Sequence, residues 1–284
     1  NNLNPSHKEG VVFTDPHMEK AYKKHNITHN RIFKTLYKDG KVANYFKQFN
    51  SIRGRNISSN KLKTKQLLQS HNIPVPKYYI WNKSFSYNTN INNIHKKLKP
   101  PYVIKPIIGS QGINVYSKIL NIGQAKPIID IMLVNYKEFI IEEFVPGFIH
   151  RIIVLNNKII SVVKRYPPYV IGNGVSTLRD LIKEFQSNSK YNVSIWLDTN
   201  NKLDGYSIRD VIPDKVTVIL SSTVNLHNGA TNSVVDIKTI HPDNVKLFKK
   251  INNITDLTLN GIDFITPDIS QSYNVSGHII EINA

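Results

Sequence analysis

Cysteine is absent from the 284 residues, which excludes disulfides, cysteine-based zinc sites and thiol catalysis. Long apolar runs are also missing, since none reaches the roughly 18 residues that a membrane-spanning helix needs. No secretory signal follows Asn1, so we expect a cytosolic (cytoplasmic) protein in a reducing compartment and no membrane partner. The chain starts without Met and stops on a strand-like run at Ala284, and we therefore expect a fragment or a trimmed product.

Acidic residues are scarce relative to basic ones: 20 Asp and Glu accompany 37 Lys and Arg, and the net charge is +17. One explanation is a polyanionic partner, such as a nucleic acid, a nucleotide or an acidic peptide. The other is a coding bias, because Lys, Asn and Ile are all abundant, as an AT-rich genome would give. The cations are spread along the chain without a block of five, and the coding bias is the favoured explanation. Hydrophobic residues make up 40%, enough for a core in one large domain or in two to three small ones.

Strand and helix patterns are mixed along the chain, and no internal repeat is visible. The clearest hairpin signal is Asn156-Asn157, which joins strands predicted at 149–155 and 158–165. Ser59 is expected to cap a helix over residues 60–71. Mixed hairpins and helices predict an α+β fold rather than a doubly wound parallel sheet.

A turn rich in small residues is the first candidate site. An apolar strand over 102–104 ends on Lys105 and leads to Gly109 and Gly112. These glycines can adopt positive φ and, without Cβ, let backbone N–H groups close on an anion. Lys105 adds a point charge for phosphate. The turn is neither a Walker loop nor a dinucleotide fingerprint. A plain hairpin with a surface lysine is the alternative.

A second candidate site lies near the C-terminus. Glu281 and Asn283 are two residues apart on a strand predicted at 278–283, so their side chains share a face. Asp263, on a strand predicted at 262–266, is expected to be their neighbour. Two carboxylates and an amide oxygen suit Mg²⁺, which takes its remaining ligands from water and phosphate. The alternative is two solvent-facing acids beside a polar Asn.

Seven motifs follow one another in a recognisable order: Asn60-Lys61-x-x-Thr64-Lys65, Ile73-Pro-Val-Pro76, Val103-Ile-Lys-Pro106, Gly109-Ser-Gln-Gly112, Ile141-Glu-Glu-Phe-Val-Pro-Gly147, Gly261-Ile-Asp263 and Ile280-Glu-Ile-Asn283. The ordered series, over residues 56–284, resembles ATP-grasp ligases. It is most similar to the ATP-grasp module of cyanophycin synthetases and of bifunctional glutathione synthetases. The resemblance implies an α+β ATP-grasp fold, in which subdomains at 58–140 and 141–284 clasp ATP after an N-terminal appendage or partial leading domain at 1–57.

The resemblance also implies a role for individual residues. By position, the two phosphate-binding lysines are Lys61 and Lys105, and the mobile phosphate loop is Gly109, Ser110, Gln111 and Gly112. The adenine-binding strand is Glu142, Glu143, Phe144 and Val145, and the arginines near the transferred phosphate and the acyl substrate are Arg151 and Arg165. The ligands of two Mg²⁺ ions, which Mn²⁺ can replace, are Asp263, Glu281 and Asn283. Neighbours on a strand point opposite ways, so we expect Glu142 to face the nucleotide and Glu143 to face solvent. An exposed hairpin residue is the alternative for Arg151.

The sequence departs from the family at two places. Ile149 stands where an acidic residue is expected at the ribose, and the loop over residues 225–230 differs from the related substrate loop. His227 in that loop is either a substrate contact or simply exposed. The related chains continue past Asn283, so with the chain ending at Ala284 we expect no second ligase domain and no polymerisation by two modules.

The resemblance implies an ATP-dependent carboxylate–amine ligase that forms an amide through an acyl phosphate. Its partners would be small-molecule or peptide carboxylates and amines, with acidic substrates favoured by the basic surface, and related enzymes often form homo-oligomers. No nucleophilic side chain is required, which agrees with the absence of cysteine. The alternatives are a catalytically silent ATP-binding module and, on the charge alone, a nucleic-acid-binding protein.

Overall fold

The structure is a computed structural model that describes residues 27–30, 35–38, 41–43, 50–110, 112–188, 202–221, 224 and 229–284. The chain divides into two compact units, residues 1–49 and residues 50–284. In the first unit, three short strands form an antiparallel sheet in the order β1 (Ile27–Asn30), β2 (Thr35–Lys38) and β3 (Lys41–Ala43). The subdomain limits expected from the sequence stay a prediction.

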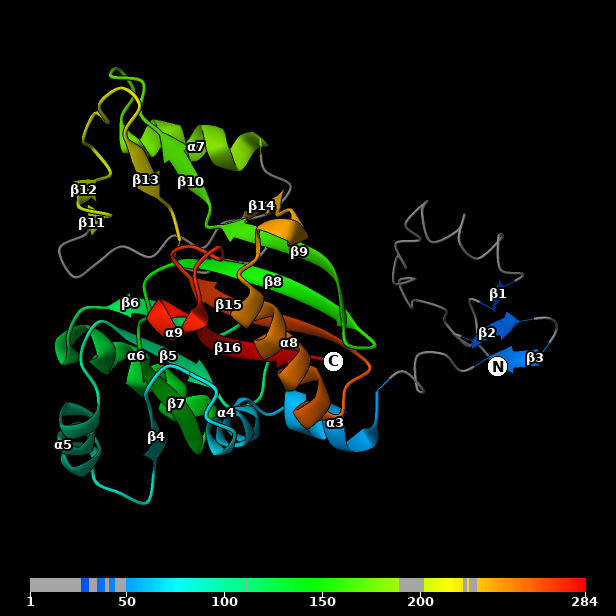
Figure 1. Ribbon diagram of the computed structural model, residues 1–284. Coiled ribbons are helices and arrows are strands. Elements are labelled where there is room, and N and C mark those ends of the chain that lie inside the picture. The colour runs from blue at the N-terminus through cyan, green and yellow to red at the C-terminus, as the bar shows by residue number, and fades with distance from the viewer. Residues whose placement is uncertain are drawn as a thin grey trace, which may run out of the picture. The chain divides into compact units, whose positions relative to one another are not determined.

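The second unit contains a four-stranded sheet (Figure 1). Its strands lie in the order β4 (Tyr78–Asn82), β7 (Glu138–Glu143), β5 (Tyr102–Pro106) and β6 (Tyr116–Ile119), each antiparallel to its neighbour. Two helices, α5 (Tyr87–Lys97) and α6 (Ile122–Asn135), pack on it through a buried core that includes Trp81, Ile129 and Phe139. The rings of Trp81 and Phe139 stack with centroids 5.6 Å apart.

A five-stranded sheet forms the other large layer of this unit. Its order is β14 (Thr231–Val234), β9 (Lys158–Tyr166), β8 (Phe148–Leu155), β15 (Leu259–Thr266) and β16 (His278–Asn283), again antiparallel throughout. The helix α8 (Pro242–Thr255) packs on it through Leu247, Phe248 and Ile251 (Figure 1). Two antiparallel sheets with helices packed against them confirm the expected α+β class.

The hairpin between β8 and β9 forms as the sequence predicts. Asn156 and Asn157 both have positive φ, 48° and 60°, the conformation that a tight two-residue turn requires. Asn tolerates this left-handed region better than most residues with a side chain. The turn sets the register that places Arg151 on β8 and Arg165 on β9.

The predicted cap at Ser59 is wrong. Ser59 instead closes the short helix α3 (Ile52–Ser58), and its backbone N–H donates to Arg55 O. Asn60 caps the next helix, α4 (Lys61–Ser70), because its side-chain oxygen accepts from the Lys63 N–H. Lys61 is therefore the first residue of α4.

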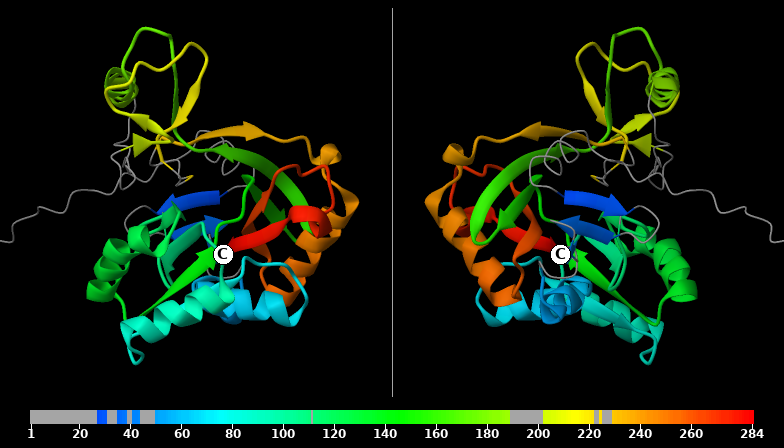
Figure 2. Two further views of the ribbon diagram at one scale, coloured as in Figure 1. Left: turned by 90° about the vertical axis from the view of Figure 1, so that its left-hand side faces the viewer. Right: turned by 90° about the vertical axis from the view of Figure 1, so that its right-hand side faces the viewer.

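A smaller module interrupts the chain between β9 and β14. It comprises β10 (Tyr169–Ile171), α7 (Leu178–Asn188), β11 (Lys202–Leu203), β12 (Tyr206–Ser207) and β13 (Thr217–Ile219). Its own core includes Leu178, Ile212 and Val218, each fully buried. Figure 2 shows this module standing apart from the two large sheets.

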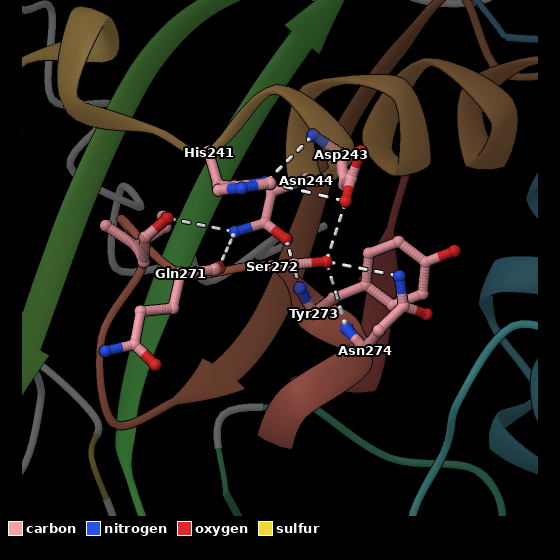
Figure 3. Close-up of polar contacts among 8 residues, drawn as sticks. His241, Asp243, Asn244, Gln271, Ser272, Tyr273 and Asn274 are labelled. Atoms are coloured by element: carbon pink, nitrogen blue, oxygen red, sulfur yellow. Dashed lines mark hydrogen bonds and ion pairs between the residues drawn. The ribbon is translucent and has the colours of Figure 1, made fainter.

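A polar network fastens the start of α8 to the loop that leads into β16 (Figure 3). The buried Asn244 donates to the carbonyl oxygens of Ile269 and Gln271, and its own oxygen accepts from the Tyr273 N–H. Ser272, which caps α9 (Tyr273–Ser276), donates to Asp243. A single turn, η2 (Ile237–Thr239), precedes α8. In the described part of the chain, no helix has the length and apolar character that crossing a membrane requires.

Candidate functional site

A cavity of about 590 Å³ lies within the second unit, between residues of both large sheets. This volume falls in the range of about 300–1,000 Å³ that is usual for small-molecule sites. The residues predicted from the sequence that line it are Lys61, Lys105, Gly109, Ser110, Gly112, Glu142, Glu143, Phe144, Val145, Arg151, Arg165, Asp263, Glu281 and Asn283. Gln111, the remaining predicted residue, lies outside the described residues.

The first turn of α4 closes one side of the cavity. Lys61 Nζ donates to the Gly109 carbonyl at 2.7 Å and lies 3.2 Å from Glu281 Oε1. The Lys61 N–H donates to Ile107 O, so the helix start and the small-residue turn are held together. Gly109 and Gly112 have φ of 153° and 72°, as the sequence predicts. Their backbone can therefore turn towards an anion where a side chain would be strained.

Glu142 lies at the floor of the cavity between two lysines. Its Oε1 is 2.5 Å from Lys105 Nζ, and its Oε2 is 2.8 Å from Lys65 Nζ. Burial acts to raise the pKa of Glu142, but the two ammonium groups outweigh it and hold the pKa below its ordinary value. Burial lowers the pKa of Lys65 to about 8, against the opposing charge of Glu142. Glu143, its strand neighbour, is partly exposed and accepts from the Lys99 N–H.

The predicted carboxylates meet on the five-stranded sheet. Asp263 on β15 lies opposite Glu281 on β16 and opposite Arg151 on β8, so the expected pairing of the two strands is confirmed. Arg151 donates from Nε and Nη2 to the two oxygens of Asp263, at 2.6 and 2.9 Å. Arg165 Nη1 lies 3.8 Å from the same carboxylate, and Asn283 Nδ2 lies 3.4 Å from it.

Burial dominates the electrostatics of this group. It raises the pKa of Asp263 even with Arg151 and Arg165 alongside, and it lowers the pKa of Arg165. The Nε of Arg165 is buried without a hydrogen-bond partner. A buried donor without a partner is costly, because it has lost its hydrogen bonds to water.

The residues expected to bind magnesium line this cavity. No three His, Cys, Asp or Glu side chains gather closely enough to hold a metal ion within the described ranges. Two carboxylates and an amide are nevertheless residue types that suit Mg²⁺, which binds through one or two carboxylates and completes its shell with phosphate and water. Asp263, Glu281 and Asn283 would hold the ion.

Four residues outside the predicted site residues also shape the site. Lys65 forms an ion pair with Glu142. The sequence feature that points to Lys65 is its spacing of four residues from Lys61, which puts both lysines on one side of a helix. Gly261 leaves room for Arg151, because a Cβ there would lie 2.8 Å from the arginine's Nη1. Lys118 also lines the cavity and lies 3.7 Å from Asp204 of the small module. Ile149 contributes an apolar wall, beside Phe148, where an acid was expected.

Comparison with known proteins gives relatives over most of the chain. The family described as sugar-transfer associated ATP-grasp matches residues 41–127. A cyanophycin synthetase from Trichormus variabilis is 30% identical over 245 residues, which cover 82% of this chain and 27% of that protein. The glutathione biosynthesis bifunctional protein GshAB from Streptococcus mutans is 24% identical over 226 residues, 74% of this chain and 29% of that protein. The chain thus spans less than a third of these relatives' length.

Among solved structures, a D-alanine–D-alanine ligase from Bacillus anthracis superposes with a TM-score of 0.54 at 13% identity, covering 82% of this chain and 59% of that one. The same enzyme in complex with ATP gives a TM-score of 0.52. At this identity the likeness establishes the fold alone.

Proposed function

Because the chain is an ATP-grasp module related to cyanophycin synthetases and bifunctional glutathione synthetases, we propose that it is an ATP- and Mg²⁺-dependent carboxylate–amine ligase. The observation that carries the proposal is the convergence on one cavity of two buried lysines, two arginines and an oxygen-ligand set. Gathering charged side chains in one cavity costs free energy, and a charged ligand that pairs with them offsets this cost.

The pairing of these charges supports a nucleotide phosphate as the ligand. Lys61 forms an ion pair with Glu281, and Arg151 forms an ion pair with Asp263. A bound triphosphate with Mg²⁺ offers each group a new partner: the cations turn to phosphate oxygens and the carboxylates to the metal. The exchange conserves charge pairing, so no buried ion is left unpaired.

The proposed reaction has two steps. A substrate carboxylate oxygen attacks the γ-phosphorus of ATP, and the bond from that phosphorus to the oxygen of ADP breaks. The amine then attacks the acyl carbon, inorganic phosphate leaves with the electron pair, and the nitrogen loses a proton. Lys61 and Lys105 would hold the phosphates, while Arg151 and Arg165 would stabilise the charge on the transferred group. Mg²⁺, when bound, would offset phosphate charge.

A catalytically silent ATP-binding module is the second candidate. Two observations favour it: the apolar wall at Ile149, and the closed bidentate pair of Arg151 with Asp263. Such a module would bind ATP but would not release ADP on addition of a carboxylate and an amine.

The test is ADP release by the whole chain with ATP and Mg²⁺ across amino acids and short acidic peptides. Release that depends on a carboxylate–amine pair would establish the ligase and name its substrates. Glu281→Gln should abolish release while the chain still folds, and the exposed Glu138→Gln is the matched control. ATP binding without release would favour the silent module, and absence of ATP binding would overturn both candidates.

A further inference from the structure

Lys65 belongs to a buried cluster of three charges with Glu142 and Lys105. The three residues are 1%, 3% and 6% exposed, and each lysine takes a different oxygen of the one carboxylate. Lys65 also lies 5.4 Å from the centre of the Tyr78 ring, a contact that favours a cation. Burying three ionised groups is expensive, and such clusters are weak contributors to stability. A contribution to ligand binding is one reason for such a cluster.

Only part of the cluster meets the cavity. Lys105 and Glu142 line it, whereas Lys65 stands behind Glu142 and is not among the lining residues. Lys65 therefore cannot touch a ligand in this arrangement, and any effect on binding must act through the carboxylate of Glu142.

The charge balance shows what that effect is. Without Lys65, Lys105 and Glu142 would form a neutral pair, and a phosphate would have to compete with the Glu142 carboxylate for the ammonium group of Lys105. With Lys65 sharing the carboxylate, the cluster keeps one net positive charge, and Lys105 is held through Oε1 alone. Phosphate then meets a lysine that is both fixed in place and still positively charged.

We propose that Lys65 is a positioning residue for the nucleotide phosphates, which holds Lys105 in place and keeps its charge available by sharing Glu142. The inference rests on the proposed function, since it deepens the phosphate-binding role of the same site. It predicts a selective effect: loss of Lys65 weakens the binding of ligands that carry phosphates and spares ligands that do not.

The experiment measures dissociation constants for ATP and for adenosine by calorimetry on the whole chain. Lys65→Met should weaken ATP binding by about tenfold or more and leave adenosine binding within about twofold. Lys65→Arg, which keeps the charge, should restore most of the ATP affinity. Lys63→Met, at an exposed position on the same helix, is the control.

The outcomes separate the inference from the proposed function. Equal weakening of ATP and adenosine, or no weakening in Lys65→Met, overturns the role of Lys65 while wild-type ATP binding still stands. Failure of the wild type to bind ATP overturns the proposed function and this inference with it. If Lys65→Met does not fold, Lys65→Gln compared with Lys65→Arg decides the question in the same way.

Discussion

Arg151 and Asp263 face each other across β8 and β15, and the guanidinium binds both oxygens of the carboxylate. The fork of the arginine matches the two oxygens of the carboxylate. Asp263 is 4% exposed; burial raises its pKa, and Arg151 opposes that shift.

Arg151→Lys should therefore impair both stability and activity. A lysine keeps the charge but cannot form two parallel hydrogen bonds, so we expect a loss of about 1–3 kcal/mol in the free energy of unfolding. ADP formation should fall by about tenfold or more for the same reason. Urea unfolding and an ADP assay would measure the two effects. Arg179→Lys, at an exposed position, is the control, and an Arg151→Lys chain indistinguishable from it would contradict the role of the pair.

Gly261→Ala should move Arg151 without unfolding the protein. The new methyl group would meet Nη1 and Cδ of Arg151 at 2.8 and 3.1 Å, and the far end of a flexible side chain can yield. We expect ADP formation to fall by about tenfold, with about 1–3 kcal/mol lost in stability. Gly123→Ala, in the first turn of α6, should leave activity intact. Full activity in Gly261→Ala would show that the position of Arg151 does not matter.

Asn244→Ala should destabilise the loop that leads into β16. The substitution removes the side-chain partner of the Gln271 carbonyl and of the Tyr273 N–H, and one of the two donors to the Ile269 carbonyl, which keeps the His241 N–H. The expected cost is about 2–4 kcal/mol in the free energy of unfolding. Asn274→Ala removes an exposed amide of the same network and should cost less than about 0.5 kcal/mol. Equal effects of the two substitutions in thermal or urea unfolding would contradict the network's role.

The buried His150 predicts sensitivity to acid. Burial lowers its pKa to about 4 from the ordinary value of 6.5, although Phe148 O lies 3.0 Å from its Nδ1. At a pH between these two pKa values, His150 binds a proton in the unfolded chain but not in the folded chain. The free energy of unfolding therefore falls as the pH drops through this window.

The loss attributable to His150 should be about 2 kcal/mol between pH 7 and pH 5. Urea unfolding at the two pH values would measure it. His150→Phe should remove this part of the pH dependence, whereas His95→Gln, at an exposed position, should leave it unchanged. The same fall in stability in both variants would rule out His150 as its source.

Local patterns carried most of the information about individual elements. The Asn156-Asn157 turn, the strand at 278–283 and the positive φ of Gly109 and Gly112 follow from short-range rules, because a tight turn or a two-residue alternation involves only neighbours in the chain. The cap at Ser59 failed for a related reason. Two capping residues stand side by side there, and only the preceding helix α3 decides which of them caps α4.

The amino-acid sequence by itself determined the family, the order of the motifs and the identity of the candidate site residues, because these depend on residue type and spacing. The tertiary structure alone decided which charges pair. Lys65 with Glu142 and Arg151 with Asp263 are separated by 77 and 112 residues. Such partners are set by strand register and by the exclusion of water from a shared interior, which no local pattern encodes. The space beside Gly261 that admits Arg151 likewise exists only once β8 and β15 lie next to each other.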